Sequence, residues 1–377
     1  MMEFRDLKKQ YQVLKPKMDQ AVIEVMESSQ FIGGSKVKEL EERLASYVGV
    51  KHCITCGNGT DALTMVLKAW GIKEGDAVFV PSFTFFASAE VVSFEGATPV
   101  FVDVDRDTFN IDVRNLEAAI KAVLKEGKLT PRVVMPVDLF GLPADYDEIQ
   151  RIADKYDLLV LEDGAQGFGG TYKGKRACSF GDAATTSFFP AKPLGCYGDG
   201  GAVFTNDDET AAYIRSFAVH GKGEHKYDNV RIGWNSRLDA IQAAILLVKL
   251  DAFEEYELKD VDQVAQWYTE LLKDKVKTPI IPEGYTSSWA QYTITLKNEQ
   301  ERDRMIDSLK EQGIPTIIYY PKPLHRQTVY KNQRLYVSCP VSEELSRTVV
   351  SLPMDPYKEK EALLNRVTRE LDAGEGL

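Results

Sequence analysis

The sequence predicts an α/β protein built around a mostly parallel central sheet. Short apolar runs recur along the chain, and stretches with a helical spacing of apolar residues separate them. The clearest case is the run 133–137, followed by a helical pattern over 146–156 and a second apolar run over 158–163. Two strands joined by a helix are parallel, because a parallel pair needs a long crossover connection. With 377 residues, 44% of them apolar, the chain can bury a large core and is long enough for two domains.

The elements follow from these patterns in chain order. Helices are predicted where apolar residues recur every three to four positions: 17–28, 36–47, 115–124, 146–156, 236–259, 301–312 and 358–373. Strands are predicted at the short apolar or β-branched runs: 77–80, 99–104, 133–137, 158–163, 185–189, 201–205, 290–296 and 316–319. Ser35 is expected to cap the second helix. The helix over 236–259 is expected to connect a large domain, residues 1–250 with the N-terminal helices included, to a small α+β domain, residues 251–377.

One lysine stands between an apolar run and a glycine-rich turn, in Ser187-Phe-Phe-Pro-Ala-Lys192-Pro-Leu-Gly-Cys-Tyr-Gly-Asp-Gly-Gly201. The glycines let the backbone approach another group closely. A lysine at a strand end in partly apolar surroundings can have a lowered pKa, which suits an amine that forms a Schiff base. Taken alone, the segment fits a solvated lysine better.

A carboxylate, Asp163, ends the run 158–163 and is expected at the carboxyl end of a parallel strand, where open α/β sheets bind ligands. Pyridoxal phosphate needs a lysine for its Schiff base and a carboxylate that keeps its ring nitrogen protonated. Lys192 and Asp163 fit these two roles. Asp163 fits equally well as the cap of a following helix.

A short strand at 53–56 runs through glycines into a helix with apolar residues at 63, 66, 67 and 70. The free amides and the positive dipole end of such a helix form a phosphate site. We expect the backbone amides of Gly59, Thr60 and Asp61, with the Thr60 hydroxyl, to bind a phosphate. The amide of Asp61 is assigned rather than its acidic side chain. This motif is weak alone, because many turns into helices have the same composition.

Five motifs occur together in one order: Gly59-Thr-Asp-Ala-Leu63, Pro81-Ser-Phe-Thr-Phe85, Glu162-Asp-Gly-Ala-Gln166, Ser187-Phe-Phe-Pro-Ala-Lys192 and Gly233-Trp-Asn-Ser-Arg237. The set resembles the DegT/DnrJ/EryC1/StrS family of pyridoxal-phosphate-dependent nucleotide-sugar aminotransferases, over nearly the whole chain. The resemblance implies the type I (aspartate aminotransferase-like) fold of pyridoxal-phosphate-dependent transferases, with a smaller C-terminal α+β domain. It also implies a homodimer with shared active sites.

The resemblance implies roles for individual residues. Lys192 would bind the cofactor covalently and carry the proton between the substrate carbon and the cofactor, and Asp163 would pair with the ring nitrogen. Gln166 would lie near the phenolic oxygen, Phe85 would stack on the ring, and Ser187 would bind the phosphate.

The same resemblance assigns Asn235 to the phosphate of the other subunit. The residues alone leave other interpretations open: Phe85 can belong to the core, Ser187 can satisfy backbone groups, and Asn235 can cap a helix. Many relatives have Asn where this chain has Pro193, and commonly His where it has Asp355, so no role is transferred to position 355. Members with His in place of the lysine catalyse dehydration, and Lys192 argues against that activity.

Segments 188–208 and 235–250 most resemble the enzymes that aminate C3 of UDP-2-acetamido-2-deoxy-3-keto-glucuronate, with glutamate as donor, for surface polysaccharides such as lipopolysaccharide. Arg237 is the candidate partner of the uronate carboxylate, since a guanidinium offers paired charge-assisted bonds, although it could pair with Asp239 instead. His325 is a further candidate, for the sugar or diphosphate, and otherwise a surface-loop histidine. The alternatives are a 4-keto or 3-keto-6-deoxy sugar nucleotide as substrate, or a non-catalytic regulatory protein that retains the fold.

Composition agrees with an enzyme of the cytoplasm. The net charge of −11 and the pI near 5.1 argue against nucleic-acid binding. Five scattered cysteines suit a reducing compartment, and the CxxC spacing at 53–56 lacks the second pair of a metal site, so no metal is expected. The N-terminus has no long apolar run, so neither a signal peptide nor a membrane span is expected.

Overall fold

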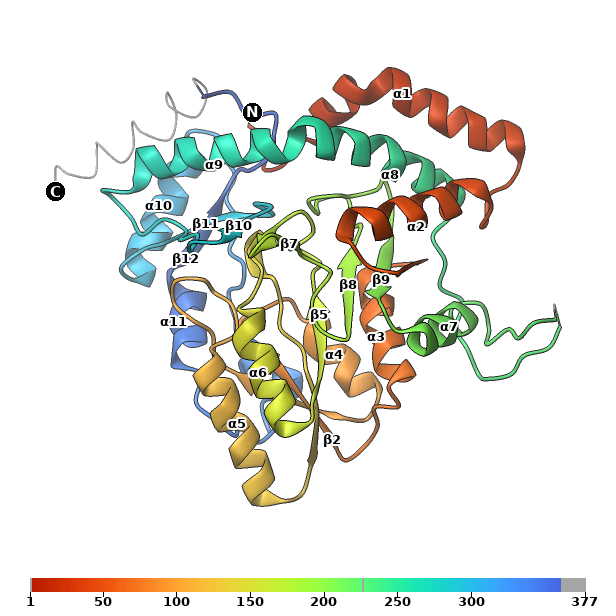
Figure 1. Cartoon of the computed structure of the whole chain (residues 1–377). Coiled ribbons are helices and arrows are strands. Elements are labelled where there is room, and N and C mark those ends of the chain that lie inside the picture. The colour runs from red at the N-terminus through yellow and green to blue at the C-terminus, as the bar shows by residue number, and fades with distance from the viewer. Residues whose placement is uncertain (1, 226, 361–377) are drawn as a thin grey trace.

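The structure, a computed structural model, describes residues 2–225 and 227–360 (Figure 1). The strands of its main sheet are β1 (His52–Cys56), β2 (Asp76–Pro81), β3 (Thr98–Val102), β4 (Thr130–Val134), β5 (Leu159–Asp163), β8 (Ala183–Ser187) and β9 (Gly201–Thr205). They lie in the order β1-β9-β8-β5-β4-β2-β3. β9 is antiparallel to β1 and β8, and all other neighbouring pairs are parallel. The prediction of a mostly parallel sheet is confirmed.

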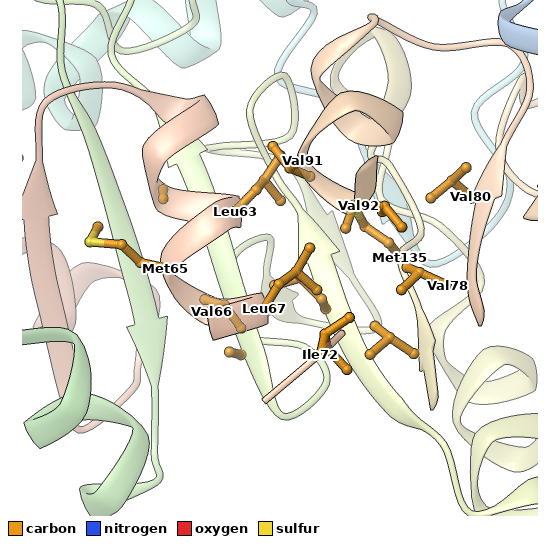
Figure 2. Close-up of a cluster of buried hydrophobic side chains, with 14 of the residues drawn as sticks. Leu63, Met65, Val66, Leu67, Ile72, Val78, Val80, Val91, Val92 and Met135 are labelled. Carbon is orange, nitrogen blue, oxygen red and sulfur yellow. The ribbon is translucent and has the colours of Figure 1, made fainter. Parts of the chain in front are cut away.

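Helices cover both faces of this sheet. They are α2 (Ser35–Val48), α3 (Gly59–Ala69), α4 (Ala87–Phe94), α5 (Val113–Glu126), α6 (Tyr146–Tyr156), α7 (Asp208–Phe217) and α8 (Ala240–Ala252), with a 3-10 turn, η1 (Leu139–Gly141). In β2, Val78 and Val80 pack with α3 and α4, whereas Ala77 and Phe79 pack with α5 and α6 on the opposite face. Figure 2 shows the first of these clusters, where side chains of α3 and α4 lie near Val78 and Met135. The parallel strands are thus buried on both faces.

α1 (Leu7–Ser28) begins at Leu7 rather than at the predicted residue 17, and it lies along α8 (Figure 1). Buried Leu14 and Met18 pack against Ile245 of α8. The first turns of α1 are mostly polar, so their pattern is too weak to predict a helix. Packing against α8 stabilises them, because most helical stability in proteins comes from tertiary contacts.

Two other predicted helix boundaries are wrong. Gly34 rather than Ser35 holds the cap position of α2. The helix predicted over 236–259 is divided: α8 begins after Asp239, whose side chain caps it, and a π-helical turn, η2 (Phe253–Glu257), separates α8 from α9 (Leu258–Leu272). A π turn inserts a residue into the helical repeat and so changes which side chains face inward. Glu257, at the end of this turn, is buried.

The chain after α9 forms a two-stranded antiparallel sheet, β11 (Tyr292–Thr295) with β12 (Val349–Leu352), and the helices α10 (Glu299–Glu311) and α11 (Pro340–Thr348). Residues of α9, β11 and β12 share one apolar cluster, and Met2 packs against it. The N-terminal segment therefore packs against the C-terminal part of the chain, at the cluster formed by α9, β11 and β12.

The predicted strand over 316–319 is wrong, because that segment makes one isolated bridge, from Ile317 to Ser351, rather than a ladder. The predicted helix over 358–373 lies mostly outside the described residues. The remaining short elements are β6 (Thr171–Tyr172), β7 (Lys175–Arg176), β10 (Tyr285–Thr286), η3 (Leu324–Arg326) and η4 (Thr328–Tyr330). Within residues 2–225 and 227–360, no helix has the length and apolar character needed to cross a membrane.

Candidate active site

A cavity of ≈ 850 Å³ opens at the carboxyl ends of β5 and β8, beside the N-terminus of α3. Its lining includes eight of the residues singled out in the sequence: Gly59, Thr60, Asp61, Phe85, Asp163, Gln166, Ser187 and Lys192. These residues come from four separate segments, which the crossover topology brings to one edge of the sheet. Asn235, Arg237 and His325 are not part of this lining.

Asp163 is the last residue of β5 and is only 5% exposed. Its carboxylate accepts hydrogen bonds from the Ser88 hydroxyl (2.9 Å) and the Ala165 amide (3.2 Å). Burial raises the pKa of Asp163, while those two donors and the nearby charge of Lys192 oppose the rise. A turn rather than a helix follows Asp163, so it is not a helix cap. A buried carboxylate that faces a cavity is well placed to balance a cationic ligand atom, and a protonated ring nitrogen fits that requirement.

Lys192 is half-buried in the turn after β8, and it lines the cavity. Burial lowers the pKa of its ammonium group, and the carboxylate of Asp163 partly offsets that effect. Among the described residues, the Lys192 amine has no hydrogen-bond or ion-pair partner. A lowered pKa increases the fraction of neutral amine near pH 7, and the neutral amine is the nucleophile.

Gln166 is held rigidly at the cavity wall. Its carbonyl oxygen accepts from the Phe140 amide (2.8 Å), and its amide nitrogen donates to the Tyr320 hydroxyl (3.0 Å). Together these bonds fix which end of the amide is the donor and leave its second N–H for a ligand. Phe85 is 55% exposed and lines the cavity beside the ring of Tyr320, so it is not a core residue.

The N-terminus of α3 differs in one respect from the expectation. The Asp61 amide, expected to bind phosphate, donates instead to the cap side chain of Asn58 (2.8 Å). Within the part of the chain that the structure describes, the amides of Gly59 and Thr60 have no protein acceptor. They lie at the positive end of the helix dipole, as an anion site requires.

Gly59 brings this helix end against the strand end that carries Ser187. A Cβ atom on Gly59 would lie 2.8 Å from the Cβ of Ser187, so a larger residue would push the two segments apart. The free amides and the Ser187 side chain therefore share one corner of the cavity. This corner fits a phosphate, and the carboxylate of Asp163 elsewhere on the cavity wall fits a protonated ring nitrogen. Pyridoxal phosphate requires both.

Asn235 and Arg237 are exposed on the segment that precedes α8. Between them, buried Ser236 donates to the Asp61 carboxylate (2.6 Å) and accepts from the Gly57 amide (2.9 Å). Asn235 does not cap α8, since Asp239 does. Arg237 has no ion pair with Asp239 or with any other described residue. Both side chains thus remain available for contacts outside their own chain.

His325 lies apart from the cavity and is 9% exposed. Its ring nitrogens bond to the Ser82 hydroxyl (2.6 Å) and to a Glu343 carboxylate oxygen (3.0 Å). The histidine, which lies in η3, thus links the loop after β2 to α11. This geometry gives no support to contact with a sugar or diphosphate, and His325 is not an exposed loop residue either.

The sequence reasoning missed Ser88 and Tyr320. Ser88 bonds to Asp163 from 75 positions away, and Tyr320 bonds to Gln166 from 154 positions away. Neither residue belongs to a local motif. Tyr320 lies five residues before the sequence candidate His325, and this proximity is its only signal in the sequence.

Comparison with known proteins places these observations in a family. The family model described as the DegT/DnrJ/EryC1/StrS aminotransferase family matches residues 12–371. A UDP-2-acetamido-2-deoxy-3-oxo-D-glucuronate aminotransferase of Pseudomonas aeruginosa is 48% identical over 360 residues, covering 95% of this chain and 96% of the relative.

Solved structures agree. A DegT DnrJ EryC1 StrS aminotransferase from Brucella abortus superposes with a TM-score of 0.96 at 50% identity, covering 100% of both chains. NtdA from Bacillus subtilis, solved with bound cofactor PMP, has a TM-score of 0.83 at 27% identity, covering 96% of this chain and 81% of that one. The prediction of a type I fold is confirmed.

Proposed function

This chain belongs to the DegT/DnrJ/EryC1/StrS aminotransferase family and is a pyridoxal-phosphate-dependent nucleotide-sugar aminotransferase; from that premise we propose that it aminates C3 of UDP-2-acetamido-2-deoxy-3-keto-glucuronate, with glutamate as amino donor. The observation that carries the proposal is the 48% identity, over 95% of the chain, to an enzyme named for that substrate. The product would be a diamino-uronic acid for a surface polysaccharide such as lipopolysaccharide. We place the reaction in the cytoplasm, whose reducing conditions suit five buried free thiols.

Different residues of this chain would have different roles in amino-group transfer. Pyridoxal phosphate, when bound, supplies an electrophilic carbonyl carbon and a ring that accepts electrons. Lys192 would carry a proton between the substrate carbon and the cofactor carbon, a role for which a neutral amine that lines the cavity is suited. Asp163 would hold a proton on the ring nitrogen. Gln166 would donate its remaining amide hydrogen to the phenolic oxygen, and Phe85 would pack against the ring face.

The phosphate would occupy the corner formed by α3 and β8. The amides of Gly59 and Thr60 and the hydroxyl of Ser187 would donate to it. Binding of the phosphate at this end would limit the positions that the ring can take in the cavity. Asp163 would then be available to the ring nitrogen and Lys192 to the reactive carbon, since both side chains line the same cavity.

Arg237 is our candidate for the uronate carboxylate, because its guanidinium is exposed and unpaired among the described residues. We expect the enzyme to prefer the 3-keto uronate over a neutral 3-keto-6-deoxy sugar nucleotide by roughly 10- to 100-fold in kcat/KM, the range that a paired charged hydrogen bond supplies. Arg237→Ala should remove this preference, and Arg237→Lys should retain part of it. The measurement is kcat/KM for both sugars with glutamate as donor.

The neutral sugar serves as the internal control, since its kcat/KM should not change in either variant. If the wild-type enzyme uses both sugars equally well and Arg237→Ala alters neither value, the uronate assignment is wrong. A strong preference for the neutral sugar would assign the enzyme to the 6-deoxy class instead.

We further propose a homodimer in which Asn235 and Arg237 reach the cavity of the partner chain. The segment that carries them exposes apolar side chains that a second copy would cover: Val230, Ile232 and Trp234, of which Ile232 is 93% exposed. A monomer would expose this apolar segment and would leave the phosphate without Asn235.

Mixing two inactive variants tests the shared site. Co-expressed Lys192→Ala and Asn235→Ala/Arg237→Ala chains should recover about a quarter of wild-type activity, because half of randomly assembled dimers are mixed and each has one complete site. The measurement is activity per subunit after purification of the mixture, with each variant alone as the control. Full activity in a species that sedimentation shows to be monomeric would contradict the proposal.

A further inference from the structure

Two cations from distant segments bind the turn that follows Lys192. The guanidinium of Arg5 donates to the Pro193 carbonyl (3.3 Å), and the ammonium of Lys249, on α8, donates to the Gly195 carbonyl (2.5 Å). In the described part of the chain, neither carbonyl accepts a hydrogen bond from another group. The two side chains therefore supply all the hydrogen bonds that these carbonyls make within the described residues.

Lys249 is only 1% exposed, which is an unfavourable position for a charged group. Burial lowers its pKa to about 7, although the carboxylate of Glu257 acts in the opposite direction. Its ammonium nitrogen lies over the ring of Tyr197, 4.5 Å from the ring centroid. A Met or Leu would fill such a space without this cost, so the bond to Gly195 is the feature that requires a lysine.

A set of buried carboxylates balances the two cations. Glu257, which the π turn η2 directs inward, accepts from Gln10 (2.8 Å) and from the Tyr357 hydroxyl (2.5 Å). Asp355, the position where relatives commonly have His, accepts from the Asp6 amide (3.0 Å) and pairs with Lys358 (2.5 Å). Asp355 thereby holds the N-terminal segment next to Arg5, and its charge also favours the protonated guanidinium.

The turn has little freedom of its own once these bonds form. A Cβ atom on Gly195 would lie 2.5 Å from the Pro190 carbonyl oxygen, so the chain is folded tightly back on itself. The Cys196 and Tyr197 amides that follow donate to Phe188 (2.8 Å) and to the Gln242 side chain (2.8 Å). Residues 193–195, directly after Lys192, thus lie between the end of β8 on one side and the Arg5 and Lys249 side chains on the other.

We propose that Lys249 and Arg5 are positioning residues for Lys192: by binding the carbonyls of Gly195 and Pro193 they hold the turn from which the reactive amine projects. The inference rests on the proposed role of Lys192. A positioning role predicts a loss of turnover in protein that is still folded, whereas a purely structural role predicts a loss of stability alone. A misplacement of a reacting group by about 1 Å can cost as much as 100-fold in rate, even when the fold is intact.

The test separates the hydrogen bond from the charge balance. Lys249→Met removes the donor and leaves buried Glu257 with only Arg5 as a nearby counter-charge among the described residues, so it should also destabilise the fold. Lys249→Met/Glu257→Gln removes both charges and should recover the thermal stability. We expect both variants to lose about 10- to 100-fold in kcat, with KM for glutamate and sugar changed by less than about threefold. Lys259→Met, the same change at an exposed lysine of α9, should change neither stability nor kcat.

A second readout does not depend on catalysis. This readout uses cofactor-free protein. The Cys196 and Tyr197 amides should exchange hydrogen for deuterium faster in the double variant than in the wild type. Arg5→Gln should give the same effect through Pro193, which keeps the test decisive if Lys249→Met does not fold. If the double variant recovers both thermal stability and kcat, Lys249 serves only to balance the charge of Glu257, and the proposal is wrong. Unchanged amide exchange in both the double variant and Arg5→Gln would also contradict it. Failure of the Lys192 assignment would instead appear as turnover that survives Lys192→Ala.

Discussion

Replacing Lys192 with alanine is expected to reduce transamination by about 10³-fold or more, because one change removes the nucleophile and the proton carrier. The side chain has no partner among the described residues and is half-buried, so little packing is lost. The measurements are kcat with glutamate and the sugar nucleotide, and the thermal unfolding midpoint. The midpoint should stay close to that of the wild type.

Cofactor retention serves as the control for this variant. The corner formed by Gly59, Thr60 and Ser187 and the carboxylate of Asp163 remain in place, so pyridoxal phosphate should still bind without a covalent bond. Borohydride should therefore fix the cofactor to the wild-type protein and not to the variant. Near-normal turnover in Lys192→Ala would refute the mechanism.

Replacing Asp163 with asparagine should lower turnover by roughly 10²- to 10³-fold, the usual cost of removing one preorganised charged group from an active site. Asparagine has the same shape, the Ala165 amide can still donate to its oxygen, and the Ser88 hydroxyl can turn to accept from its nitrogen. Burial raises the pKa of Asp163, which means that the fold disfavours its charge. The variant should consequently unfold at an equal or higher temperature than the wild type.

Ser88→Ala is the matched control, because it removes one donor to the same carboxylate and leaves the charge. Its loss in kcat should be about tenfold at most, in keeping with one hydrogen bond to a charged group. A structural role for Asp163 predicts the opposite pattern, with lower thermal stability and little change in kcat. That pattern would refute the assignment to the ring nitrogen.

The elements with strong local signals could be predicted from the sequence. α6 occupies 146–156 as expected, since Asp145 caps an amphipathic repeat, and β9 occupies 201–205 between a glycine turn and a polar end. The first turns of α1 and the π turn before α9 could not be predicted, because tertiary contacts rather than local pattern determine them. The β-branched run at 316–319 satisfies the strand pattern but lacks a neighbouring ladder.

The candidate site divides in the same way. Lys192, Asp163 and Gln166 lie in short motifs that meet at one sheet edge, so the topology rule for parallel strands brings them together. Asp61 shows the limit of such reasoning, since its amide donates to the side-chain oxygen of Asn58 and is no longer available to a phosphate. Ser88 and Tyr320 depend on side-chain directions across the fold, which no local spacing encodes.

The contacts at the N-terminus also determine when the site can be completed during synthesis. Arg5 binds a carbonyl 188 positions later, and the Asp6 amide binds the side chain of a residue 349 positions later. Closing loops of this length is slow, and the second contact cannot form until residue 355 has left the ribosome. If Arg5 supports the turn after Lys192 as proposed, that turn would reach its final form only after this contact has closed, and removal of the first six residues would take away a support that no local motif reveals.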